Sequence, residues 1–116
     1  MVLVVDDNVD AARTLAALLE LEGWHTTIAH DASHAVEAAA RTLPEIALLD
    51  LGLPKVSGYE LAAMLRTSSH GRKLRLAAIS GWGQEDAKVR SSASGFDRHF
   101  TKPVESDELL RWLGQP

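Results

Sequence analysis

The sequence contains no cysteine among its 116 residues, which excludes disulfides and thiolate metal sites. It has no run of the roughly 18 apolar residues that a membrane-spanning helix needs, and its first residues, MVLVVDDN, lack the charged flank of a signal peptide. An excess of positive charge is also missing, because the formal net charge is −4. We therefore expect a cytoplasmic protein that has no membrane anchor of its own and no nucleic acid as a partner.

The length is that of one average domain, and such a chain buries roughly two-thirds of its unfolded surface on folding. We expect residues 1–116 to form a single domain with one core. The first apolar run begins at residue 2 with no lead-in, which is compatible with a segment of a longer protein.

Four short apolar runs each end on a polar residue of a particular kind. Residues 2–5 precede Asp6 and Asp7, residues 45–49 precede Asp50, residues 76–79 precede Ser80, and residues 100–101 precede Lys102. Short apolar runs between helical patterns are typical of parallel strands buried on both faces. Because ligands bind at the carboxyl ends of such strands, we expect three carboxylates, a hydroxyl and an ammonium group at one edge of one sheet.

The remaining periodicity predicts helices between these strands. Strands are expected over 2–5, 24–29, 45–50, 74–80 and 97–101, and helices over 8–22, from Asp31 to before Pro44, over 58–68 and 84–94, and from Glu105 or Ser106 to Leu113. This alternation of five βα units predicts an α/β fold with a doubly wound, five-stranded parallel sheet. The predicted strand order is the flavodoxin-like 2-1-3-4-5.

The residue types at the predicted sheet edge indicate phosphoryl chemistry. Clustered carboxylates repel one another unless a cation lies among them, and oxygen ligands with no softer group nearby suit Mg²⁺. An aspartate beside a divalent cation is able to attack a phosphoryl group, while a lysine and a hydroxyl hold the phosphoryl oxygens. A single Asp after a strand is more often a helix cap or turn residue, so the joint pattern carries the prediction.

From end to end the sequence resembles the receiver domain of two-component response regulators. The matching residues are Asp6 and Asp7, Asp50 followed by Leu53, Pro54 and Gly58, then Ser80, and last Lys102 with Pro103. The segments LGLPKVSGYELA, ISGWGQ and SGFDRHFTKPV look especially like receivers that are fused to, or act with, sensor histidine kinases.

The resemblance implies a role for each matching residue. Asp50 would accept the phosphoryl group, and Asp7 and Asp50 would bind Mg²⁺ directly. Asp6 would act largely through metal-bound water, and Gly52, two residues past the acceptor, would offer its backbone carbonyl to the metal.

The remaining implied roles concern the phosphate. Lys102 would pair with it, the peptide bond between Lys102 and Pro103 would be cis, and Ser80 would donate a hydrogen bond to it and act as a switch.

One position departs from the family pattern. Receivers usually carry Tyr or Phe three residues before the lysine, whereas this sequence has His99 there, followed by Phe100. We therefore expect little inward rotation at the switch position. Trp82, two residues past Ser80, is expected either to stand over the site and shield the aspartyl phosphate or to point to solvent.

The resemblance predicts a phosphoacceptor in a His-to-Asp phosphorelay. The domain would catalyse only its own phosphorylation and dephosphorylation, with a sensor histidine kinase or a histidine phosphotransfer protein as donor, and kinase activity would require a larger hybrid protein. Two alternatives stay open: a degenerate receiver that only binds a protein partner, and an aspartyl-phosphate phosphatase. The complete acidic set disfavours the first, and Gly52 stands where such phosphatases commonly place a second Asp.

Overall fold

A computed structural model describes residues 1–53, 55–67, 73–81 and 95–115. Within these residues the chain forms, in order, β1 (Val2–Val5), α1 (Val9–Leu21), β2 (Thr26–Ala29), α2 (Ala32–Thr42), β3 (Ile46–Asp50), α3 (Gly58–Thr67), β4 (Arg75–Ser80), β5 (Arg98–Thr101) and α5 (Ser106–Leu113). The helix expected over 84–94, as well as Pro54 and Trp82, lies outside the described residues.

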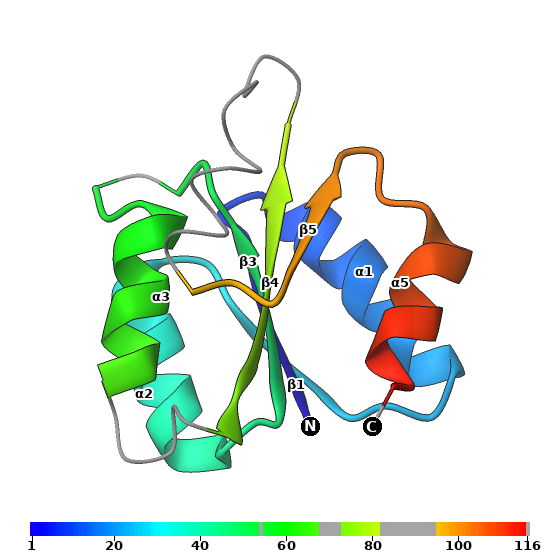
Figure 1. Ribbon diagram of the computed structural model, residues 1–116, viewed down its shortest axis with the longest axis horizontal. Coiled ribbons are helices and arrows are strands. Elements are labelled where there is room, and N and C mark those ends of the chain that lie inside the picture. Colours follow the sequence, from blue (N-terminus) through cyan, green and yellow to red (C-terminus); the bar gives the residue numbers. More distant parts are fainter. Residues whose placement is uncertain (54, 68–72, 82–94, 116) are drawn as a thin grey trace.

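The strands form one parallel sheet in the order β2-β1-β3-β4-β5. Helices α2 and α3 cover one face, and α1 and α5 cover the other (Figure 1). This arrangement confirms the predicted doubly wound, flavodoxin-like sheet. Because all strands run in the same direction, their carboxyl ends lie at one edge, where the polar residues after β1, β3, β4 and β5 meet.

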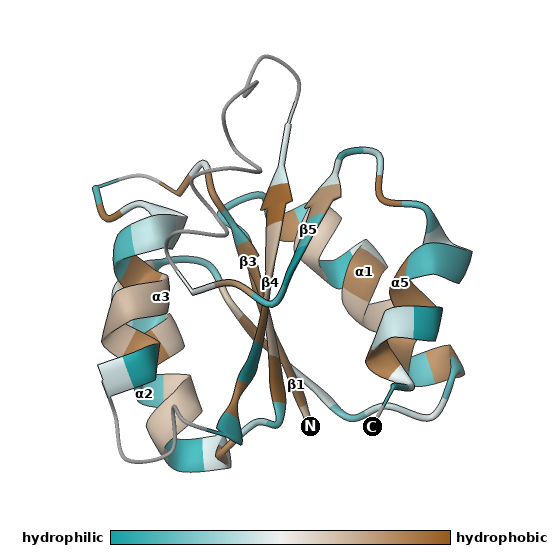
Figure 2. Ribbon diagram, viewed as in Figure 1, coloured by the Kyte–Doolittle hydropathy of each residue, from teal (hydrophilic) through white to brown (hydrophobic). Residues whose placement is uncertain are grey.

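The core is divided by the sheet into two apolar layers. Along β1, Leu3 and Val5 pack toward α2 and α3, whereas Val2 and Val4 pack toward α1 and α5. Every residue of β1 and β3 is buried, as expected for central strands covered on both sides. In Figure 2 the central strands are largely hydrophobic, whereas the helices beside them carry both hydrophobic and hydrophilic residues.

Side-chain caps begin the first two helices where the sequence predicts them. The Asn8 side chain accepts a hydrogen bond from the Ala11 N–H at 3.0 Å, and the Asp31 side chain accepts one from the His34 N–H at 2.8 Å. Both bonds satisfy backbone donors that have no partner within the helix. The caps fix where the chain turns from the carboxyl edge of the sheet into a helix.

The expected strand over 24–29 is shorter than predicted, because the end of α1 takes up its first residues. Gly23 has a φ of +94°, and the N–H groups of Gly23 and Trp24 donate to the carbonyls of Glu20 and Leu19. This Schellman arrangement is a common helix ending. Trp24 consequently packs against the core and β2 begins at Thr26.

In the described part of the chain, no helix combines the length and apolar composition that crossing a membrane requires.

Candidate functional site

Three carboxylates gather at the carboxyl edge of the sheet. Asp6 and Asp7 follow β1 and Asp50 ends β3, the neighbouring strand, so that one carboxylate oxygen from each lies within 4.8 Å of the other two. Asp6 and Asp50 are each 8% exposed, whereas Asp7 is exposed. The cluster is therefore open to small ions on one side and buried on the other.

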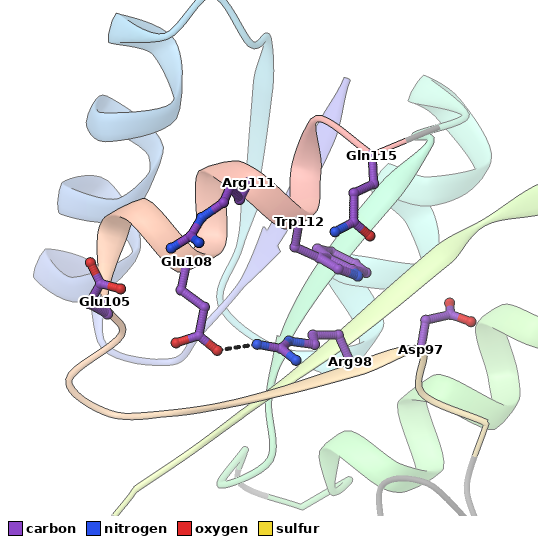
Figure 3. A pocket seen from close by; sticks show the side chains of 7 residues that line it. All are labelled: Asp97, Arg98, Glu105, Glu108, Arg111, Trp112 and Gln115. Atoms are coloured by element: carbon purple, nitrogen blue, oxygen red, sulfur yellow. Dashed lines mark hydrogen bonds and ion pairs between the residues drawn. The ribbon is translucent and has the colours of Figure 1, made fainter.

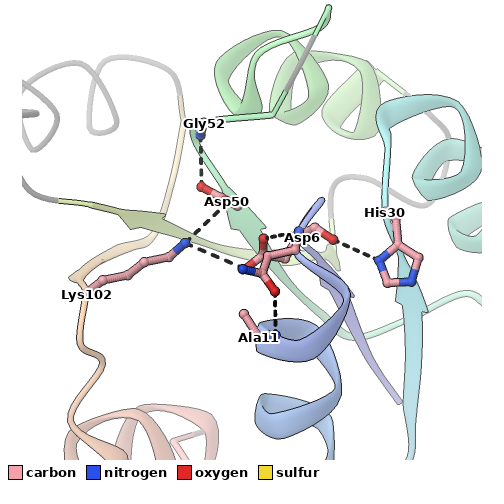
Figure 4. A network of polar contacts seen from close by, with 7 residues as sticks. Asp6, Ala11, His30, Asp50, Gly52 and Lys102 are labelled. Carbon is pink, nitrogen blue, oxygen red and sulfur yellow. Dashed lines mark hydrogen bonds and ion pairs between the residues drawn. The ribbon is translucent and has the colours of Figure 1, made fainter.

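Lys102 reaches this cluster from the end of β5. Its Nζ lies 3.4 Å from Asp50 Oδ2 and 3.7 Å from Asp6 Oδ2, as Figure 4 shows. The Lys102 N–H donates to the Ser80 carbonyl at 2.7 Å, and the Lys102–Pro103 peptide bond is cis, as the resemblance predicts. A single ammonium group thus partly balances two carboxylates that come from different strands.

The surroundings of Asp6 disfavour its ionised form. Its pKa is raised, mainly because burial removes the carboxylate from water, and the nearby Asp50 charge adds to this effect. The Asn8 N–H and the Lys102 ammonium act in the opposite direction without reversing the shift. Three carboxylates beside one ammonium group leave an excess of negative charge that a bound cation would relieve.

Backbone N–H groups aim the two buried carboxylates. The Gly52 N–H donates to Asp50 Oδ1 at 2.9 Å, and the Asn8 N–H donates to Asp6 Oδ1 at 2.9 Å. Asp50 Oδ1 is held by the loop after β3 and Oδ2 faces Lys102 (Figure 4). Gly52 therefore lies directly beside Asp50.

Ser80 ends β4, with its hydroxyl beside a histidine. The residue is 2% exposed, and its Oγ lies 2.7 Å from His99 Nε2 on β5. The two strands pair in parallel with Ala78 opposite His99, so His99 lies on the same face of the sheet as Ala78 and Ser80. The two predicted switch residues are thus in direct contact.

Phe100 does not replace the missing aromatic residue at position 99. It is buried on the opposite face of β5, where its ring meets Trp112 of α5 edge to face, with ring centroids 6.0 Å apart. Adjacent residues of a strand point to opposite faces, and therefore the Phe100 ring is directed away from His99.

His30 is a contact of the site that the sequence does not indicate. Its Nδ1–H donates to the backbone carbonyl of Asp6 at 2.9 Å, which fixes the chain between β1 and α1 from the side of β2 (Figure 4). A lone His after a strand carries no sequence pattern that predicts this bond. In the described ranges, the one group of three potential metal ligands consists of aspartates alone.

A groove of about 590 Å³ lies away from the carboxylates, between β5 and α5. Charged side chains line it, and Arg98 and Glu108 form an ion pair across it (Figure 3). The groove is lined by none of Asp6, Asp7, Asp50 and Lys102, so it is separate from the acidic site.

The family of the chain follows from comparison with known proteins. Residues 2–113 match the family described as the response regulator receiver domain. The phosphate regulon transcriptional regulatory protein PhoB of Pseudomonas aeruginosa is 30% identical over 112 residues, which cover 97% of this chain and 49% of PhoB. The chain thus spans about half the length of this relative.

Two solved structures superpose closely on the fold. The receiver domain of NtrX from Brucella abortus has a TM-score of 0.89 at 30% identity, covering 97% of this chain and 94% of that one. The receiver domain of the sensor histidine kinase PA1611 from Pseudomonas aeruginosa, solved with a magnesium ion coordinated in its active site cleft, has a TM-score of 0.87 at 27% identity, covering 97% and 92%. The chain belongs to the response regulator receiver domain family.

Proposed function

We propose that residues 1–116 form a single phosphoacceptor domain of a His-to-Asp phosphorelay and that Asp50 accepts the phosphoryl group. The observation that carries this proposal is the position of Asp50, whose two carboxylate oxygens are held by the Gly52 N–H and the Lys102 ammonium beside two further carboxylates. This arrangement orients a carboxylate oxygen for attack and supplies positive charge next to it.

In the proposed transfer, an oxygen of Asp50 forms a bond to the phosphorus of a phosphohistidine. The bond between phosphorus and the imidazole nitrogen of the donor breaks, and its electron pair stays on that nitrogen. Lys102, which lies 3.4 Å from Asp50 Oδ2, is placed to hold a phosphoryl oxygen as negative charge moves toward it. Ser80, at the end of the next strand, is placed to donate a hydrogen bond from its hydroxyl to another phosphoryl oxygen.

The same residues fit a magnesium ion. Three carboxylates within 4.8 Å of one another, one of them with its pKa raised by burial and by its neighbour, form the hard oxygen donor set that Mg²⁺ prefers. We assign direct contacts to Asp7 and Asp50, a contact through water to Asp6, and a backbone carbonyl contact to Gly52. When bound, the ion would offset the charge of the attacking carboxylate and of the incoming phosphoryl group together.

The relatives suggest the donor and the setting of the domain. PhoB is a transcriptional regulator and PA1611 is a sensor histidine kinase, so receivers similar to this one occur in both kinds of protein. We propose a sensor histidine kinase or a histidine phosphotransfer protein as the donor. The resulting aspartyl phosphate shifts the conformational population that a protein partner binds.

Phosphoryl uptake tests the proposal. Incubation with Mg²⁺ and a small phosphodonor should add one phosphoryl group to the intact mass of the chain, and a chelator should prevent the addition. Asp50→Asn should abolish uptake, whereas the control Asp10→Asn, in the exposed first turn of α1, should retain it. Equal uptake by Asp50→Asn, or uptake that resists the chelator, would contradict the assignment.

The alternatives predict different results in the same assay. A degenerate receiver would take up no phosphoryl group with or without Mg²⁺. A phosphatase would release inorganic phosphate from generic phosphate esters over many turnovers, and Gly52 offers no side-chain acid for that reaction.

A further inference from the structure

The contact between Ser80 and His99 links the phosphate-binding hydroxyl to β5. Ser80 Oγ and His99 Nε2 are 2.7 Å apart, and Ser80 is almost completely buried at 2% exposure. At this separation one of the two atoms donates a hydrogen bond to the other, and the imidazole tautomer decides which one donates. In the tautomer whose Nε2 carries no proton, the Ser80 hydroxyl is the donor.

A serine hydroxyl has one proton to donate. Phosphoryl oxygens that carry negative charge act as acceptors, so a bond from Ser80 to a phosphorylated Asp50 needs that same proton. Ser80 is thus unable to donate to His99 and to the phosphoryl group at once. The two acceptors compete for a single donor.

We propose that His99 is a positioning residue that holds the Ser80 hydroxyl away from the phosphoryl site until Asp50 is phosphorylated. The inference rests on the proposed function and extends it to a residue that departs from the family pattern. Phosphorylation exchanges the acceptor of Ser80, because the hydroxyl leaves Nε2 and donates to a phosphoryl oxygen. His99 then loses this partner, and the change reaches β5 through a hydrogen bond instead of an aromatic rotation.

The exchange affects the rate of phosphorylation. In the unphosphorylated protein the bond to His99 satisfies a buried hydroxyl, and breaking it opposes the reaction. A phenylalanine at position 99 keeps a ring but offers no acceptor, so the buried hydroxyl is left unsatisfied until the phosphoryl group arrives. Removing the acceptor should therefore accelerate phosphorylation, although the changed residue itself touches no reacting atom.

The first test uses the unphosphorylated protein and is independent of phosphoryl transfer. Nitrogen NMR of the full chain should show His99 Nε2 without a bound proton at neutral pH, and Ser80→Ala should shift that resonance. A protonated Nε2, or a resonance unmoved by Ser80→Ala, overturns the proposal even if phosphorylation of Asp50 is confirmed.

The second test measures the rate of uptake from a small phosphodonor. His99→Phe should react roughly fivefold faster than the parent, the factor expected for the loss of one competing hydrogen bond. His99→Gln, which restores an acceptor oxygen, should return the rate to near the parental value. The control His25→Phe, in an exposed position before β2, should leave the rate unchanged.

A double-mutant cycle separates positioning from general packing effects. In a Ser80→Ala background, His99→Phe should no longer alter the rate, because the competing donor is gone. An equal effect of His99→Phe in both backgrounds, or slower uptake by His99→Phe, overturns the proposal. Failure of the parent to take up phosphate would instead reject the proposed function, and the nitrogen spectrum would still decide whether Ser80 donates to His99.

Discussion

Asp6 carries a negative charge in a place that disfavours it. Its pKa is raised because the carboxylate is buried and lies beside Asp50, and the contact with Lys102 at 3.7 Å compensates only in part. Charged groups in such surroundings reduce stability while they prepare a site for a cation. The ionised Asp6 carboxylate is therefore expected to favour metal binding and to lower the stability of the metal-free protein.

Asp6→Asn should stabilise the metal-free protein by about 1 kcal/mol at neutral pH, which corresponds to a melting temperature about 4 °C higher. Asparagine keeps an oxygen for the Asn8 N–H but removes the buried charge. The variant should also lose much of the stabilisation that Mg²⁺ gives the parent by binding to the folded state. Thermal unfolding with and without Mg²⁺ measures both effects.

The pH dependence of this prediction follows from the direction of the shift. Because the pKa of Asp6 is higher in the folded than in the unfolded state, its contribution to stability is fully present below the unfolded pKa and is lost as the pH rises through the folded pKa. The advantage of Asp6→Asn should thus be small in acid and grow toward neutral pH. Asp7→Asn is the matched control, because Asp7 is exposed; an equal gain from both variants would show that burial is not the cause.

Individual residues of the site differ in how far the sequence predicts them. Asp6, Asp50 and Ser80 each directly follow or end a buried apolar run, and Asp7 and Lys102 lie one or two residues past an apolar strand residue, so the parallel sheet brings them together by topology alone. The bonds of His30 and His99 depend on rotamers and on strand register between segments 24 and 19 residues apart. No local pattern encodes such contacts, and only the folded structure shows them.

The start of α3 lies against the end of β3 more closely than a side chain allows. A Cβ added to Gly58 would lie 2.8 Å from the Asp50 carbonyl oxygen and 2.8 Å from Leu51 Cα, both of which are backbone atoms. The Gly58 N–H also faces the Leu51 carbonyl at 3.5 Å. This glycine lets α3 pack tightly against the end of β3 that carries Asp50.

Gly58→Ala should lower the free energy of unfolding by about 2 kcal/mol, because backbone must move to admit the methyl group. It should also slow phosphoryl uptake, since that movement displaces the loop between Asp50 and α3. Gly114→Ala is a matched control, because the added Cβ would meet its nearest atom at 3.6 Å, an ordinary contact. Equal stability of the parent and Gly58→Ala in urea unfolding would refute the tight packing.

Arg66, in the last turn of α3, joins three segments. Its guanidinium donates to the carbonyls of Leu74 and Gly95 and to Asp97 Oδ2, the last at 2.8 Å. Asp97 Oδ2 also accepts from the Leu76 N–H at 2.8 Å. The start of β4 and the chain before β5 are thereby tied to a helix on one face of the sheet.

Arg66→Met should lower the free energy of unfolding by about 2 kcal/mol, because it keeps the apolar stem but removes charge-assisted hydrogen bonds. Arg66→Lys should recover little of the loss, since a lysine lacks the planar fork that contacts several acceptors at once. The control is Arg13→Met at an exposed position of α1. Denaturation midpoints that agree among all four proteins would contradict a structural role for Arg66.

The bounds of the helices and strands in the described part of the chain were predicted to within one or two residues. The strand starts at Thr26 and Arg98 and the end of α3 at Thr67 differ from the expected 24, 97 and 68. Caps such as Asn8 and Asp31 are local signals and are therefore visible in sequence. The late start of β2 results from the hydrogen bonds that end α1. The N–H groups of Gly23 and Trp24 donate to carbonyls of α1 and are therefore not available to a strand.

The molecule as a whole places its chemistry at one edge and leaves two helical layers for other contacts. Aspartates from β1 and β3 and a lysine after β5 meet where the parallel strands end (Figure 4), and Ser80 ends β4, which lies between β3 and β5 in the sheet. A phosphoryl group at Asp50 would add about 1.5–2 negative charges to this edge. Contacts that cross between strands, such as those of Lys102 and His99, are the routes by which the change reaches β5.

The identity of the phosphorylated residue is the sharpest test of the proposed function. After incubation with Mg²⁺ and a small phosphodonor, the acyl phosphate is reduced with borohydride and the modified residue is located by mass spectrometry of peptides. We expect modification of Asp50 alone, and none when a chelator is present. Modification of Asp6, Asp7 or any other residue in place of Asp50 would contradict the proposed function, as would an unmodified chain in the presence of Mg²⁺.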